Sequence, residues 1–308
     1  MRKIPLTSAV LAVLGLTAVG LAGCSQPSTA ACPRPVDDAS VVDLVRVSGD
    51  LDADPDVEFY TPLHQKTTAS ADIVVGEGAP IETDAQVVVL DLTLLSGADG
   101  EQLLQGTTRP AQLQELTTAI PGLSDGLRCA TEGTRTVIAL APDDLSPQAA
   151  ASAGLEEDDS AVAVVDVRQV YLARANGADV FNSDSGLPTV VRASDGRPGI
   201  IIPDSAAPTD LVVETIVRGD GPVVTGEQPV RVHYTSVDWS TRTQRQTTWD
   251  SAPAAVAFGA DAPAFAQALE GQTVGSQVLV VVPAGEDGGG SAVVYVVDIL
   301  GIDAAATR

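Results

Sequence analysis

The aromatic residues of this chain are few, and most of them lie in one short interval. The 308 residues include ten aromatic side chains, and six of these fall between positions 234 and 295. The six are Tyr234, Trp239, Trp249, Phe258, Phe265 and Tyr295. Rings gathered in one small domain can line a water-poor cavity that takes up a neutral ligand. They can also form an ordinary hydrophobic core, and the rings alone do not separate these alternatives.

Residue types that bind metals or act as bases are scarce. His64 and His233 are the only histidines, and with three cysteines they leave little material for a zinc site. The acidic runs at 52–56 and 156–159 lack the glycine and glutamate pattern of an EF-hand loop, and are predicted to be solvated turns. The alternation of the strand expected at 230–237 turns His233 away from its apolar face, toward solvent or a neighbouring strand edge. We therefore expect no metal and no cofactor.

The charge balance excludes partners that are themselves strongly acidic. The chain has 17 lysine and arginine residues against 41 aspartate and glutamate residues, which gives a formal net charge of −24. A surface of this sign repels phosphate backbones and anionic lipid headgroups. Binding to nucleic acid, and binding to a membrane through a basic patch, are both excluded by this argument.

The start of the chain carries an export signal. Residues 1–3 are a short basic segment, and residues 6–22 form an apolar stretch rich in alanine, leucine and valine. The sequence Leu-Ala-Gly-Cys at 21–24 resembles the bacterial lipobox, whose cysteine becomes the lipidated first residue of the mature protein. Residues 1–23 are thus predicted to be a lipoprotein signal peptide, and Cys24 to anchor the chain at the outer face of the cell membrane. The alternative is an ordinary secreted protein in which Cys24 is incidental.

Two cysteines remain if Cys24 carries lipid. Cys32 and Cys129 have one possible pairing, and disulfides persist in the compartments to which exported proteins are sent. A disulfide between them is predicted, and two buried free thiols are the alternative. Residues 24–40 are rich in serine, proline and alanine, and are interpreted as a tether between the membrane and the folded body.

Most of the remaining chain consists of short valine, isoleucine and leucine runs separated by glycine, aspartate and proline. This pattern indicates antiparallel β structure with few helices, that is, an α+β fold. The clearest strands are predicted at 87–94, 135–140, 161–170, 211–218, 230–237, 277–282 and 292–300. Short helices are predicted only at 122–129 and 263–269, each just before a strand.

The order of these signals occurs twice, which indicates an internal repeat. Residues 73–78 and 216–221 are both a strand that ends in a Gly-acid-Gly turn. Further along, residues 122–135 match residues 265–277, and each of these segments leads into a strand followed by a proline. Two domains, a linker with one short strand, and a tail are therefore predicted, at 41–177, 208–302, 178–207 and 303–308, respectively.

Five motifs of the second half resemble a known family. They are the strand and turn at 213–222, Val-Arg-Val-His-Tyr-Thr at 230–235, Trp-Asp-Ser at 249–251, the segment 268–277 and the closing strand at 293–300. Their order and spacing resemble an FKBP-type peptidyl-prolyl cis–trans isomerase domain that spans residues 208–302. The whole layout, a lipoprotein signal followed by two such domains, resembles a group of actinobacterial FKBP lipoproteins.

The resemblance implies both a fold and an activity. Each domain would be an antiparallel β-sheet wrapped on a short α-helix, and the second would rotate X–Pro peptide bonds in an apolar pocket. Its site residues would be Tyr234, Trp249, Asp250, Phe265 and Tyr295. Phe265 would be the floor of the pocket, and Tyr234 and Asp250 would make hydrogen bonds at its rim. An apolar pocket disfavours the planar, charge-separated form of the amide, so neither a nucleophile nor a cofactor is required.

Two departures from the family bear on this activity. The family carries a long flap with an aromatic residue after the position of Pro283, but here the chain continues with Ala-Gly-Glu-Asp-Gly-Gly-Gly-Ser. Weak turnover is expected from this shortened flap. In the first half, Asp91 is aligned with Tyr234 and the neighbouring segments lack rings. That half is therefore predicted to be a degenerate FKBP-like domain with a structural or interaction role.

The leading hypothesis is an extracytoplasmic prolyl isomerase that assists folding by acting on X–Pro segments of exported proteins. A non-catalytic FKBP-like chaperone or scaffold that binds exposed apolar peptide is the alternative, and the shortened flap favours it. A lipoprotein that captures a solute is a third alternative, although the large hinged α/β halves of that class are missing. The chain is expected to be a monomer that meets the membrane only through its lipid anchor.

Overall fold

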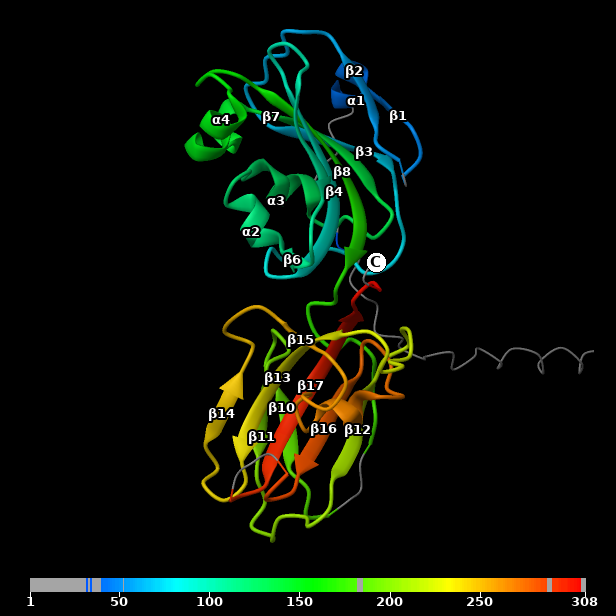
Figure 1. Ribbon diagram of the computed structural model, residues 1–308, viewed down its shortest axis with the longest axis vertical. Helices are drawn as coiled ribbons and strands as arrows, with labels where there is room; N and C mark the ends of the chain where they lie inside the picture. The colour runs from blue at the N-terminus through cyan, green and yellow to red at the C-terminus, as the bar shows by residue number, and fades with distance from the viewer. Residues whose placement is uncertain are drawn as a thin grey trace, which may run out of the picture. The chain divides into compact units, whose positions relative to one another are not determined.

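The computed structural model describes residues 32, 34, 40–51, 53–181, 185–286 and 290–305. The predicted signal peptide, the lipidation site Cys24 and most of the predicted tether lie outside these residues. Within them, the chain forms two large antiparallel sheets, one in each half of the sequence (Figure 1). Helices are few and short, so the prediction of an α+β fold is confirmed.

The sheet of the first half has the strand order β3-β7-β8-β4-β5, and β6 pairs with β4. Its elements are α1 (Ser40–Leu44), β1 (Val45–Ser48), β2 (Asp56–Phe59), β3 (Ala69–Val74), β4 (Val87–Ser96), β5 (Gln102–Thr107), β6 (Ala111–Gln112), α2 (Leu113–Thr117), α3 (Gly122–Leu127), β7 (Arg135–Leu140), a 3₁₀ turn η1 (Pro142–Asp144), α4 (Pro147–Ala153) and β8 (Ala161–Val170). The helix predicted at 122–129 is α3, and it packs against β7.

The sheet of the second half has the order β14-β13-β17-β16-β12-β9, and β15 pairs with β13. Its elements are β9 (Ala178–Asp179), β10 (Thr189–Arg192), β11 (Pro198–Ile201), β12 (Val212–Arg218), β13 (Val230–Asp238), β14 (Gln244–Thr247), β15 (Ala254–Val256), η2 (Ala266–Leu269), β16 (Gln277–Val282) and β17 (Val293–Ile302). The helix predicted at 263–269 is shorter than expected and is the 3₁₀ turn η2, which begins after Pro263 and ends before Gly271, whose left-handed backbone (φ +79°) cannot continue a helix.

Each sheet is covered on both faces. We call the face that packs on the helical segments the helix face, and the opposite one the hairpin face. On the hairpin face of the first sheet, Val45 and Phe59 of the β1–β2 hairpin pack against Val137 and Val164. Covering of both faces also explains why β7 and β16 are mostly apolar: every residue of these two strands is buried, so neither strand has a polar side.

The second sheet is covered in the same way, by a hairpin that the sequence did not predict. Val190 of β10 and Ile200 of β11 pack against Leu279 and Val294 of the sheet. The interval 178–207, expected to be a linker with one short strand, therefore contributes an edge strand, β9, and a covering hairpin. A hairpin packed on one sheet face is thus part of the repeat in both halves.

Candidate functional site

Three of the five predicted site residues form one cluster on the helix face of the second sheet. The ring centroids of Tyr234 and Phe265 are 5.2 Å apart, those of Phe265 and Tyr295 are 4.8 Å apart, and those of Tyr234 and Tyr295 are 6.2 Å apart. Tyr234 is on β13, Tyr295 on the neighbouring β17, and Phe265 immediately precedes η2. The tilted ring pairs have the geometry that aromatic side chains prefer. We call these three residues the ring cluster.

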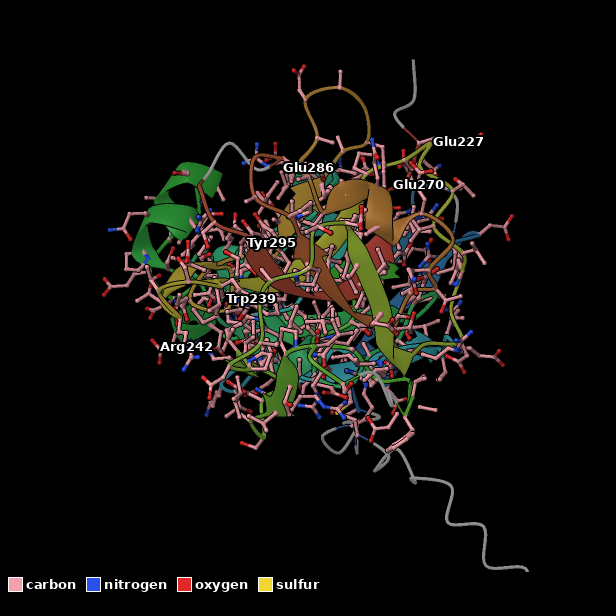
Figure 2. All side chains as sticks on the ribbon, turned by 90° about the horizontal axis from the view of Figure 1, so that it is seen from below. Glu227, Trp239, Arg242, Glu270, Glu286 and Tyr295 are labelled. Atoms are coloured by element: carbon pink, nitrogen blue, oxygen red, sulfur yellow. The ribbon has the colours of Figure 1, made fainter. Side chains whose placement is uncertain are left out.

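The ring cluster reaches the surface at Tyr234. Phe265 is 2% exposed and Tyr295 is 6% exposed, so both belong to the core of the second half. Figure 2 shows Tyr295 within the layer of packed side chains. Tyr234 is half-buried, and its hydroxyl donates a hydrogen bond to Gln246 Oε1 at 3.1 Å. The exposed side of Tyr234 is therefore where an apolar peptide segment could meet the rings.

Trp249 and Asp250 lie away from the ring cluster. The indole of Trp249 stacks on His233, with centroids 4.5 Å apart and planes 21° apart. Because side chains alternate along β13, His233 lies on the hairpin face, opposite Tyr234. The Asp250 carboxylate accepts a hydrogen bond from Arg197 Nη2 at 2.7 Å, and the same guanidinium donates to the Trp249 carbonyl at 3.0 Å. Arg197 comes from the turn of the β10–β11 hairpin, so that hairpin holds the 249–250 segment.

The side chain of His233 is partly buried, which is a further difference between the structure and the expectation. The expectation was solvent or a strand edge, but the stacked Trp249 covers the imidazole. Burial, with a smaller effect from the positive charge of Arg197, lowers the pKa of His233 from 6.5 to about 4. Its Nδ1 lies 2.9 Å from Thr248 Oγ1. A neutral histidine held in this way is a packing element of the hairpin face.

We predict that His233 makes stability depend on pH in a defined window. Its pKa in the folded state is below the value of 6.5 in the unfolded chain, so between pH 6.5 and about 4 the unfolded chain binds more protons. The stabilisation is complete above pH 6.5 and declines by about 3 kcal/mol as the pH falls through this window. NMR titration of the His233 ring should give a pKa near 4. Titration near 6.5 would show that the ring is not covered.

The first half carries aliphatic residues where the second carries rings. Strand register provides the correspondence, since Asp91 lies opposite Asp166 on β8 just as His233 lies opposite Asp298 on β17. Asp91 therefore corresponds to His233, and the sequence alignment of Asp91 with Tyr234 was wrong by one residue. Such a shift moves a side chain to the other face of the sheet. The positions that correspond to Tyr234, Phe265 and Tyr295 are Leu92, Leu123 and Ala163, all buried.

Arg197 and Gln246 are site neighbours that the sequence analysis missed. Arg197 is separated from Asp250 by 53 positions, and no local pattern connects the two.

Cys32 and Cys129 are both disulfide-bonded, the state expected for an exported chain. Among the described residues, no group of three or more histidine, cysteine, aspartate or glutamate side chains is arranged to hold a metal ion.

The comparisons with known proteins give one curated relative and a set of structural neighbours. No family model matches the chain. It is 29% identical to an FK506-binding protein of Streptomyces anulatus over 34% of this chain and 97% of that protein. The three FKBP domains of wheat FKBP73 align at 13% identity and a TM-score of 0.34, covering 77% of this chain and 94% of that one. A putative peptidyl-prolyl cis–trans isomerase, FKBP12 of Mycobacterium tuberculosis, aligns at 25% identity and a TM-score of 0.26, covering 31% and 86%.

Proposed function

We propose that the second half of this chain, as a domain of the FKBP-type peptidyl-prolyl isomerase family, catalyses cis–trans isomerisation of X–Pro bonds in exported proteins. The observation that carries the proposal is the ring cluster, in which Tyr234 joins two buried rings to the surface. The curated relative supports membership of this family, and the positions of the rings support the second half as the location of the proposed activity.

The mechanism follows from the apolar character of the ring cluster. Rotation about an X–Pro bond is opposed by a barrier of about 18–20 kcal/mol, which arises from amide resonance. The planar amide is charge-separated and loses more by leaving water than the twisted transition state does. A proline seated against Tyr234 would therefore have its transition state stabilised relative to its ground state. This step needs an apolar surface that excludes water from the peptide bond, and it needs no covalent bond to the protein.

A non-catalytic chaperone is the second candidate, and a specific observation favours it. Trp249 and Asp250, which the family resemblance places at the pocket, are held on the hairpin face by Arg197. In addition, the described part of the loop after β16, at 284–286, contains no aromatic residue. Both features leave the ring cluster without the groups that would enclose a bound proline.

A direct cis–trans assay separates the two candidates. The chain that lacks residues 1–23 is mixed with a short X–Pro peptide, and exchange between the two isomers is followed by NMR at increasing protein concentration. Acceleration in proportion to the protein concentration supports the isomerase. An unchanged exchange rate, together with suppressed aggregation of an unfolded client, would support the chaperone and contradict the isomerase.

The proposed place of action is the outer face of the cell membrane, with Cys24 as the lipid anchor. Among the described residues, no helix is long and apolar enough to cross a membrane. The basic start and the Leu-Ala-Gly-Cys motif are the features that support an anchor.

Replacing Cys24 with serine is expected to move the protein out of the membrane fraction, because the acyl chains that hold it there can no longer be attached. The measurement is fractionation of cells and medium, with mass determination of the amino terminus. Replacing Ser25 with alanine is the matched control and should leave the protein in the membrane fraction. A Cys24→Ser protein that is cut before residue 24 and stays membrane-bound would contradict the lipoprotein.

A further inference from the structure

The first sheet has two edge strands, and the chain protects only one of them. At one edge, β3 carries Asp72, whose carboxylate pairs with Arg34 from the segment before α1. At the other edge, β5 pairs with β4 alone among the described strands. An unpaired edge presents a row of free N–H and C=O groups to which another strand can add. The edge of β5 is therefore a surface that can receive a partner.

The sequence of β5 lacks the features that usually block such pairing. Its six residues, Gln102–Thr107, include no charged residue and no proline. Leu104 is 50% exposed, although it is a large apolar side chain. In the second half, β14 pairs with β13 as β5 pairs with β4, but β14 is four residues long and carries Arg245, which pairs with Asp238. A short and charged edge of that kind discourages pairing, whereas β5 is longer and uncharged.

The free hydrogen-bonding groups of β5 can be located from its pairing with β4. The N–H of Thr108 donates to the carbonyl oxygen of Leu90, so the backbone of Thr108 points toward β4. Because the direction of these groups alternates along an antiparallel strand, the N–H and C=O groups of Gln105 and Thr107 point to the free side. Gln105, near the middle of β5, thus offers both a donor and an acceptor to a partner strand.

Opposite charges flank β5 at positions that suit pairing with a second copy of the chain. Glu101 precedes Gln105 by four positions, and Arg109 follows it by four. When two copies pair antiparallel with Gln105 opposite Gln105, Glu101 of each copy lies opposite Arg109 of the other. The register shift between β4 and β5 near Leu103 moves this match by at most one residue, which two long side chains can span.

Both flanking side chains are available for such a contact. Glu101 and Arg109 are exposed, and neither forms an ion pair within the part of the chain that the structure describes. Registers with another centre fit less well. A centre at Leu104 would use backbone groups that already face β4, and a centre at Leu103 or Thr107 would separate the charges and leave part of each strand unpaired.

We propose that the first half forms a homodimer in which the β5 strands of two copies pair antiparallel about a two-fold axis at Gln105. The contact uses the same patch on both copies and joins their sheets into one. The net charge of −24 on each chain opposes association, so a surface that is uncharged along its length and has opposite charges at its ends is the one that favours it. This dimer replaces the expectation of a monomer. It is independent of the isomerase, because the ring cluster belongs to the second half.

The experiment is sedimentation velocity on the chain without residues 1–23, in which Cys24→Ser prevents thiol-linked dimers. This parent chain is expected to show a monomer–dimer equilibrium that shifts toward dimer as the protein concentration rises. Arg109→Glu places two carboxylates opposite each other at both ends of the contact and should weaken association at least about tenfold. Glu101→Arg should do the same with two guanidinium groups. A chain with both changes restores opposite charges and should associate like the parent.

Two further variants test the strand pairing and control for net charge. Gln105→Pro removes the outward N–H at the axis and should abolish the dimer, while a proline whose nitrogen faces solvent is tolerated in an edge strand. Arg218→Glu changes the net charge as Arg109→Glu does, but Arg218 is exposed on β12 of the second half. It should leave association unchanged. Urea unfolding of each variant shows whether the fold is retained.

Several outcomes would overturn the proposal. One is a parent chain that stays monomeric at its highest soluble concentration, and another is a dimer that persists in folded Gln105→Pro. Failure of the double charge change to recover the association lost in the single variants would contradict the register centred on Gln105. Equal weakening by Arg218→Glu and Arg109→Glu would show that net charge, rather than the contact with Glu101, controls association.

Discussion

Replacing Phe265 with leucine is expected to lower the isomerase rate by at least about tenfold while the second half stays folded. The ring of Phe265 packs against both other rings, with centroid separations of 5.2 Å from Tyr234 and 4.8 Å from Tyr295. Leucine keeps most of the buried volume but removes the ring against which a proline would pack. A substitution that approximately conserves volume costs less than about 1.5 kcal/mol of unfolding free energy. The measurement is the NMR exchange assay on the chain without residues 1–23, together with urea unfolding.

The first half supplies the matched control for this variant. Leu123 holds the position that corresponds to Phe265 and is fully buried on the helix face. Leu123→Met changes the core to a similar extent and is expected to leave the isomerase rate unchanged. A folded Phe265→Leu protein with wild-type turnover would show that the ring cluster is not where catalysis takes place. Equal loss of rate in both variants would show that the rate depends on how tightly the core is packed in general.

Replacing Asp166 with alanine is expected to destabilise the first half by about 3–5 kcal/mol. Arg135 is 2% exposed, and its guanidinium contacts both carboxylate oxygens of Asp166 at 2.6 Å. Hydrogen bonding to Asp166 raises the pKa of Arg135 above its ordinary value. A guanidinium is protonated at neutral pH even without such a partner, so Arg135 stays charged when Asp166 is removed. An uncompensated buried charge is then left beside the carbonyls of Gly49 and Asp50. Urea unfolding monitored by circular dichroism measures the loss.

Asp298→Asn in the second half is the contrasting variant. Asp298 has glutamine rather than arginine opposite it, and burial raises its pKa from 3.8 to about 6. A raised pKa in an acid stabilises the fold below about pH 3.8, and this contribution is lost as the pH rises through 6. Asparagine removes the buried charge, so at pH 8 the variant should be as stable as the wild type or more stable. If Asp166→Ala cost no more than Asp298→Asn, the ion pair would not be what holds the first half together.

Much of the fold could be predicted because its signals are local. The runs at 135–140 and 277–282 predicted strands, and the structure has strands with these same limits. Each is buried on both faces, so every residue along the strand is apolar or paired, and no tertiary information is needed to recognise it. The repeat was visible for the same reason, since a Gly-acid-Gly turn after a strand is a short-range pattern. The three ring-cluster residues were also identified from the sequence, with the help of the family resemblance.

Other features depend on contacts between segments that are far apart in the sequence. In the covering hairpin, β10 is the one short strand that was expected in the linker, but β11 was hidden in a polar, glycine-rich interval, because only one side of this strand is buried. Its Arg197 then holds Asp250, which the resemblance had placed at the pocket rim. Side-chain alternation along β13 puts His233 and Tyr234 on opposite faces, so a one-residue error in alignment assigned Asp91 to the wrong face.

The sequence by itself thus determined the strands and the repeat, because burial along a strand shapes each segment independently of its partners. The residues of the ring cluster were identified only with the family resemblance. The tertiary structure decided which face each ring occupies and that Arg197 pairs with Asp250. It also decided that Arg135 pairs with Asp166 in the first half, whereas Gln277 lies opposite Asp298 in the second. These outcomes depend on strand register and on contacts between distant segments. Contacts of that kind leave no periodic pattern in the sequence from which they could be predicted.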